Sequence, residues 1–363
     1  MPELNVGVDI CSAFVPGTNA FLRGENDAAR AVDKSLAADV RLGFRFNKST
    51  RQGLLYRGMY QGIGLGVNSF FNNTLLGTPV SAYVYQGAPV MRLGRRVWLG
   101  YEWQFGAAFG WKHHKKGEPD NNVVAGTSVT AHMALGLKVH YQLSAEWQLS
   151  AGIEARHFSN GNTASPNAGA NTVGLSLGMA YVINPGGESA AAPASLIAEA
   201  DKGYWFYDII AYGAWRRRAV TVTDIPQMCP GKFAVAGMQF AAMRSLNRRV
   251  AVGPALDMQW DESAGLGPYW VEGTYDDGIR FERPPFGRQL SVGVSAHAEL
   301  TMPVFAVNAG LGVDIINPRG NKRFYQSLAL KAFVSRNIFL NIGYRLGNFK
   351  DPQNLMLGFG LRL

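Results

Sequence analysis

The sequence predicts an all-β protein, a transmembrane antiparallel β-barrel of about sixteen strands. Three observations support this prediction. Segments of about ten residues alternate between apolar and small or polar side chains. The composition combines 43 glycines and 12% aromatic residues with only 17% charged residues. No run of about 18 consecutive apolar residues occurs, which excludes a helical membrane protein.

The segment 97–111 shows the alternation most clearly. Its odd positions, from Val97 through Trp103 to Trp111, are apolar or aromatic, and its even positions are mostly small or polar. A period of two is that of a β-strand. Long segments with an apolar outer face and a polar inner face are typical of outer-membrane barrels. The alternative interpretation of the same alternation is a large soluble β-sandwich. The same pattern recurs at three further segments, 129–143, 290–300 and 355–363.

Connection lengths predict which end of the barrel faces which side of the membrane. In outer-membrane barrels the short turns are periplasmic and the long loops are extracellular. The longer polar loops are then extracellular, and both ends of the chain lie on the periplasmic side. The short connections lie at 144–146, 246–249, 301–303 and 335–337, and the longer polar loops at 112–127, 160–171 and 262–287.

Residues 183–203 are the exception to this rule. They form a long Ala-, Pro- and Ser-rich segment on the short-turn side, and they separate the strands eight and eight. We therefore expect two tandem eight-stranded barrels, residues 1–182 and residues 204–363, joined by a periplasmic linker at 183–203. The alternative is one larger barrel of about sixteen strands with a long periplasmic loop.

Net charge, cysteine content and the first residues give three further expectations. The formal net charge is +9, but no recognised nucleic-acid-binding fold accompanies it, so we expect no nucleic acid partner. Cys11 and Cys229 are far apart in the sequence and are expected to be inert free thiols. No signal peptide is recognisable at the start of the sequence, which is therefore expected to be a mature form with an added Met.

Two polar residues interrupt the apolar face of the segment 147–159. Its odd positions are apolar up to Ala155, and the series continues through His157 and Ser159, which parity places on the lipid-facing side. Asn171 shares the outward parity of the next segment. Polar groups facing lipid are costly, and a Ser, a His and an orienting group can form a hydrolytic triad. The alternative is a polar loop rim that contains a His and a Ser by chance.

The residues around this position resemble a known active-site segment. Arg-His-Phe-Ser-Asn-Gly at 156–161, followed by Pro-Asn-Ala-Gly-Ala-Asn at 166–171, resembles the PagL family of outer-membrane lipid A deacylases, some of which are acyloxyacyl hydrolases. Residues 14–26 also resemble longer relatives of this family. The resemblance covers about residues 1–182, and its specific part is the His-x-Ser-Asn motif. It implies an eight-stranded barrel whose last two strands carry the site.

The resemblance also implies a role for each site residue. Ser159 would be the nucleophile and His157 the general base, with no metal or cofactor required. The backbone N–H of Asn160 and the side-chain amide of Asn167 would form the oxyanion hole. Asn171 stands where the family has a Glu, and this is a departure. A neutral Asn can orient a His but stabilises the imidazolium less.

Two functions follow as hypotheses. The first is a serine esterase in the bacterial outer membrane, a lipid A deacylase, that removes an ester-linked acyl chain from lipid A or lipopolysaccharide in the outer leaflet, among outer-membrane lipids. The second is a non-catalytic barrel, either a lipid-binding pseudo-enzyme, a channel or an assembly partner. Residues 204–363 lack the motif, since the equivalent strand end reads Tyr-Arg-Leu-Gly-Asn at 344–348. We expect them to be a structural or substrate-positioning partner.

Overall fold

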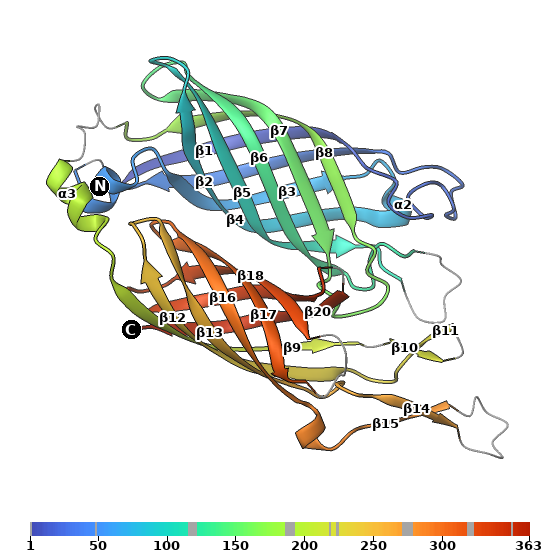
Figure 1. Cartoon of the computed structure of the whole chain (residues 1–363). Coiled ribbons are helices and arrows are strands. Elements are labelled where there is room, and N and C mark those ends of the chain that lie inside the picture. The colour runs from blue at the N-terminus through green and yellow to red at the C-terminus, as the bar shows by residue number, and fades with distance from the viewer. Residues whose placement is uncertain are drawn as a thin grey trace. The chain divides into compact units, whose positions relative to one another are not determined.

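The computed structural model describes residues 2–47, 49–114, 122–185, 193–217, 219–222, 225–270, 279–317, 323–349 and 351–363. They form two closed antiparallel barrels of eight strands each (Figure 1). The prediction of two tandem barrels is therefore confirmed, and the alternative of one larger barrel is wrong. None of the helices in the described ranges is long and apolar enough to cross a bilayer.

The first barrel follows the chain order. Neighbouring strands pair antiparallel, and the barrel closes where β1 pairs with both β2 and β8. Val8 of β1 lies opposite Val40 on one side and Met179 on the other. The strands are β1 (Glu3–Phe14), β2 (Lys34–Arg45), β3 (Tyr60–Ser69), β4 (Gly77–Arg92), β5 (Val97–Trp111), β6 (Val129–Gln142), β7 (Trp147–Ser159) and β8 (Ala170–Val182).

The second barrel repeats this plan. It closes where its first strand, β9, pairs with its last strand, β20, so that Gly213 lies opposite Leu357. Its strands are β9 (Trp205–Arg216), β12 (Phe233–Ser245), β13 (Val250–Asp261), β16 (Leu290–Thr301), β17 (Phe305–Ile316), β18 (Phe324–Phe333), β19 (Ile338–Gly347) and β20 (Asp351–Arg362).

Short elements occupy the connections. The predicted linker, 183–203, contains the helix α3 (Ala194–Ala200), while its residues 186–192 lie outside the described residues. Two hairpins extend from the second barrel, and alternation did not reveal them because each of their strands has only four residues. The elements are α1 (Arg51–Leu55), α2 (Asn73–Leu76), β10 (Ala219–Val222) with β11 (Ile225–Met228), β14 (Gly267–Trp270) with β15 (Ile279–Glu282), and the 3-10 helix η1 (Phe286–Arg288).

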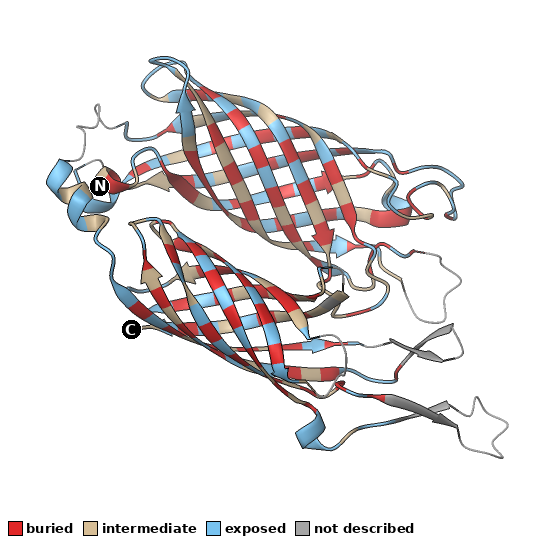
Figure 2. Ribbon diagram, in the orientation of Figure 1, coloured by how far each residue is buried: buried red, intermediate tan, exposed pale blue. Residues whose placement is uncertain are grey.

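The barrel walls alternate in burial as the sequence predicts. Bands of buried and exposed residues cross both barrels in Figure 2. On β6, Leu135 and Leu137 are 63% and 51% exposed, whereas the neighbouring Lys138 is buried. A side chain that points outward from a closed barrel meets the surroundings, and one that points inward meets the lumen. The outward set is apolar, which is the arrangement of a barrel that lies in lipid.

Charged side chains pair inside each barrel. Lys138 on β6 lies 2.9 Å from Glu102, 3.1 Å from Asp9 and 3.2 Å from Glu154. In the second barrel, Lys331 lies 2.7 Å from Asp208 and 2.6 Å from Glu299. In both barrels, a lysine of the sixth strand thus meets an aspartate of the first. The charged side chains that the alternation directs into each lumen therefore form ion pairs with one another.

Candidate active site

The outward parity of His157 and Ser159 is confirmed. On β7 the even-numbered Arg156 and Phe158 are buried, whereas His157 and Ser159 are partly exposed. The ladder register places His157 directly opposite Asn171 of β8. The site therefore lies on the outer wall, where the last two strands of the first barrel reach their connecting loop.

His157 and Asn171 are hydrogen-bonded across the two strands. Nδ1 of His157 lies 2.7 Å from Oδ1 of Asn171. An amide oxygen only accepts hydrogen bonds, so Nδ1 must carry the proton and donate it. In the neutral ring the other nitrogen, Nε2, then has the lone pair of a base.

Gly169 brings the loop against both catalytic candidates. Its φ of +70° belongs to the left-handed region that glycine adopts without strain. A Cβ built on Gly169 would lie 3.5 Å from His157 Cε1, 3.5 Å from Ser159 Cβ and 2.7 Å from the carbonyl oxygen of Phe158. His157 and Ser159 therefore flank one point on the loop, which only a residue without a side chain can occupy.

Asn160 and Asn167 also meet. The backbone N–H of Asn160 donates to Oδ1 of Asn167 at 2.7 Å. The side-chain amide of Asn160 turns the other way and donates to the carbonyls of Ala164 at 3.0 Å and Pro166 at 3.3 Å. The two residues predicted to form the oxyanion hole are thus hydrogen-bonded to each other. The Asn160 N–H is already paired with Oδ1 of Asn167.

Contacts from the loop that contains Val123 and Val124 hold this segment in place. The N–H groups of Ala168 and Gly169 donate to the carbonyls of Val123 at 2.9 Å and Val124 at 3.0 Å. Beneath the site, the ring of Phe158 packs against Trp111, with ring centroids 5.3 Å apart. Sequence reasoning missed these supports because residues far apart in the chain meet only after the barrel closes.

Glu154 does not supply a carboxylate to His157. Its side chain is buried in the lumen, where it lies 2.7 Å from Arg156 and 3.2 Å from Lys138. This agrees with the inward parity of even positions on β7. The hydrogen bond that the described residues give to His157 is the one to Asn171, at 2.7 Å.

Solved structures with a detectable likeness include a siderophore receptor, CdiB and a porin. The siderophore receptor PirA from Acinetobacter baumannii matches with a TM-score of 0.26 and 8% identity over 95% of this chain and 68% of that one. CdiB from Acinetobacter baumannii matches with a TM-score of 0.20 and 11% identity over 100% of this chain and 60% of that one. A mutant Rh. blastica porin matches with a TM-score of 0.18 and 7% identity over the whole of both chains. These scores are too low to support an inference about this chain.

Family models give a clearer result, although no curated protein sequence matches the chain. Residues 38–180 match the model described as lipid A 3-O-deacylase (PagL), and residues 205–363 match the one described as acyloxyacyl hydrolase, C-terminal domain. These matches, together with two closed barrels that have apolar outer walls, place the chain in the outer membrane. Since the two matches cover most of the chain, the chain belongs to the PagL family of lipid A 3-O-deacylases.

Proposed function

We propose that the first barrel, residues 1–182, is a serine esterase that removes an ester-linked acyl chain from lipid A in the outer leaflet. The observation that carries the proposal is the 2.7 Å hydrogen bond between His157 and Asn171, on the outer wall and beside Ser159. A serine needs a base to become a nucleophile, and that base needs a partner that fixes its tautomer.

The proposed reaction has two stages. Ser159 Oγ attacks the ester carbonyl while Nε2 of His157 takes the hydroxyl proton. The tetrahedral intermediate then collapses, and His157 returns the proton to the departing sugar oxygen, which leaves an acyl-enzyme. Water, deprotonated by His157, hydrolyses this ester and releases the fatty acid, so that Ser159 regains its proton.

The oxyanion would be stabilised by Asn160 and Asn167. In the structure, Oδ1 of Asn167 lies 2.7 Å from the backbone N–H of Asn160, a separation typical of a donor that can serve an oxyanion. We propose that the substrate oxygen replaces Oδ1 at this N–H. The side-chain amide of Asn167 would then donate a second hydrogen bond to the same oxygen.

The outer wall explains how a lipid substrate would arrive. Residues next to the site on the same face are apolar and exposed, with Val173 47% and Ile153 59% exposed. An acyl chain in the membrane can lie along this wall while its ester linkage reaches Ser159. The substrate would therefore enter sideways from the bilayer rather than through the lumen, which charged side chains fill.

The remaining parts of the chain would support this reaction. We propose that residues 183–203 act as a periplasmic linker and that residues 204–363 are a structural or substrate-positioning partner. At the matching position of the second barrel, β19 ends with Tyr-Arg-Leu-Gly. This strand has neither a serine nor a histidine.

The experiment that tests the proposal is mass spectrometry of lipid A after incubation with the purified full-length protein. We expect wild type and the control Ser150→Ala, which alters an inward-facing serine of the same strand, to remove an acyl chain. We expect Ser159→Ala to lose at least about 10³-fold in rate, since loss of a nucleophile removes the covalent route. If folded wild-type protein leaves lipid A intact, the esterase proposal fails and the non-catalytic barrel is favoured.

A further inference from the structure

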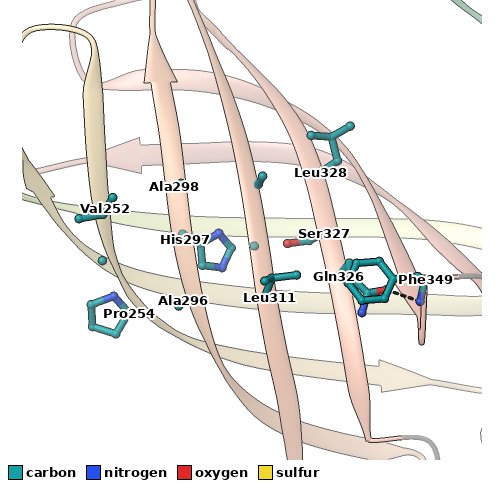
Figure 3. A pocket seen from close by; sticks show the side chains of 13 residues that line it. Val252, Pro254, Ala296, His297, Ala298, Leu311, Gln326, Ser327, Leu328 and Phe349 are labelled. Atoms are coloured by element: carbon teal, nitrogen blue, oxygen red, sulfur yellow. Dashed lines mark hydrogen bonds between the residues drawn. The ribbon is translucent and has the colours of Figure 1, made fainter.

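The outer wall of the second barrel carries an apolar groove of about 840 Å³ (Figure 3). Its volume lies within the range of about 300–1,000 Å³ that is typical of small-molecule sites. Its lining includes Pro254 of β13, Ala296 and Ala298 of β16, and Ala309 and Leu311 of β17. This groove belongs to the second barrel alone and shares no residue with the site at Ser159.

Small side chains on adjoining strands create the hollow. The register pairs Pro254 with Ala296, and Ala298 with Ala309, so the small outward residues of three strands adjoin. Further along the same faces, the larger Val294 and Val313 point outward and are 47% and 46% exposed. The outer surface is therefore hollowed over Ala296, Ala298 and Ala309, where the side chains are shorter than the neighbouring valines.

Three polar residues are among those that line this groove: His297, Ser327 and Gln326. His297 and Ser327 share the inward-facing register of Gly310, so Gln326 is the one of the three on the outward face. Gln326 on β18 lies opposite Leu311, which points outward, so Gln326 also belongs to the outward face. Yet Gln326 is only 7% exposed. Its Oε1 accepts a hydrogen bond of 2.6 Å from the backbone N–H of Phe349, drawn in Figure 3.

The amide nitrogen of Gln326 lacks an acceptor. Within the described ranges, its Nε2 is buried and has no hydrogen-bond partner. A buried donor left without a partner is costly, and this cost is larger where no water can reach it. The groove, which Gln326 and the exposed Phe349 both line, is where an acceptor could be supplied.

The surroundings define the chemistry of that acceptor. The groove lies on the lipid-facing wall, and among the described residues that line it none is a lysine or an arginine. Its chemistry therefore suits a hydrocarbon chain and one neutral acceptor, rather than a phosphate group. An acyl chain together with the carbonyl that links it to a lipid supplies both features.

We propose that this groove binds one acyl chain of a bilayer lipid, with the carbonyl oxygen of its linkage accepting a hydrogen bond from Gln326 Nε2. The chain lies over the alanine floor between Leu311 and Leu328, and its carbonyl enters beside Phe349. The second barrel thereby holds a lipid without hydrolysing it. This inference does not depend on the esterase function of the first barrel.

The experiment is native mass spectrometry of the full-length protein after exchange into two lipids in parallel. One is 1-palmitoyl-2-oleoyl-phosphatidylethanolamine, and the other is its dialkyl ether analogue, which lacks both carbonyls. We expect wild type to retain the ester lipid roughly fivefold more than the ether lipid, the effect of one hydrogen bond. We expect Gln326→Leu to retain both equally.

A second pair of variants tests the groove itself. Ala309→Trp fills the floor, and Val313→Trp adds the same ring on the same face of β17 outside the groove. We expect Ala309→Trp to lose the retained lipid and Val313→Trp to keep it. Equal retention of ester and ether lipids by wild type would overturn the proposal, as would an unchanged ester preference in Gln326→Leu. A native mass spectrum that shows a second protein chain bound in place of the lipid would also overturn the proposal.

Discussion

His157 of β7 and Asn171 of β8 are direct cross-strand neighbours, joined by a hydrogen bond of 2.7 Å between Nδ1 and Oδ1. The group that orients the proposed base is therefore a neutral amide, and the ladder register holds it in place. A neutral acceptor selects the tautomer as a carboxylate would, but it offers no charge to an imidazolium. This difference can be tested directly.

Replacing Asn171 by Glu should preserve the rate of deacylation or raise it by up to about tenfold. A carboxylate accepts the same Nδ1–H bond and adds a charge-assisted interaction with the imidazolium that forms when Ser159 is deprotonated. The measurement is kcat for release of fatty acid from lipid A.

The comparison variant is Asn171→Leu, which keeps the approximate size of the side chain and removes the acceptor. Its kcat should fall by about 10²–10⁴-fold, because the ring loses the partner that fixes its tautomer. A complete loss of activity in Asn171→Glu, with the barrel still folded, would show that Asn171 has a different role.

Replacing Asn167 by Asp tests the proposed oxyanion hole. Aspartate keeps an oxygen that can accept from the Asn160 N–H but loses the amide donor. We expect kcat to fall by about 10²–10³-fold while substrate binding changes little, which is typical of removing one oxyanion donor. Initial rates over a range of lipid A concentrations separate kcat from KM. A rise in KM alone would indicate a binding role instead.

Replacing Gly169 by Ala should lower activity by about 10²-fold without unfolding the barrel. The new Cβ would lie 2.7 Å from the Phe158 carbonyl oxygen and 3.5 Å from His157 Cε1 and Ser159 Cβ, in a backbone with φ of +70°. A displacement of about 1 Å at a catalytic group can cost this much. The control is Gly94→Ala, since a Cβ there meets nothing within 4 Å. Equal activity of the two variants would contradict the prediction.

Replacing Lys138 by Met should destabilise the first barrel. Asp9, Glu102 and Glu154 would share the lumen without the ammonium group that lies 2.9–3.2 Å from them. Breaking a buried ion pair costs about 3–5 kcal/mol. The measurement is the free energy of unfolding in urea. The exposed Lys34→Met is the control and should stay within about 0.5 kcal/mol of wild type.

Strand-level features of this protein were predictable from the sequence. Alternation placed Lys138 inside and Leu137 outside, because successive side chains of a strand must point to opposite faces. The same rule placed His157 and Ser159 outside before any contact was known. The hairpin β14–β15 was not predicted, since strands of four residues are too short to show a period.

The contacts of the site were less accessible to sequence reasoning. Parity indicated that Asn171 faces outward one strand from His157, and the family resemblance pointed to the same residue. Neither observation indicated that a side chain at Gly169 would meet both His157 and Ser159, or that the carbonyls of Val123 and Val124 accept hydrogen bonds from this loop. Such contacts depend on how these two loops pack against each other at one end of the barrel.

By itself, the sequence determined the strands of the two barrels, their inward and outward faces, the division into eight and eight, and the polar pair on the apolar face. Only the tertiary structure decided which residues meet across strands. It set His157 opposite Asn171 in the first barrel and gathered the alanines and Gln326 into one groove in the second. The physical reason is that register and closure set cross-strand neighbours, and a slip of one residue would turn every side chain to the other face.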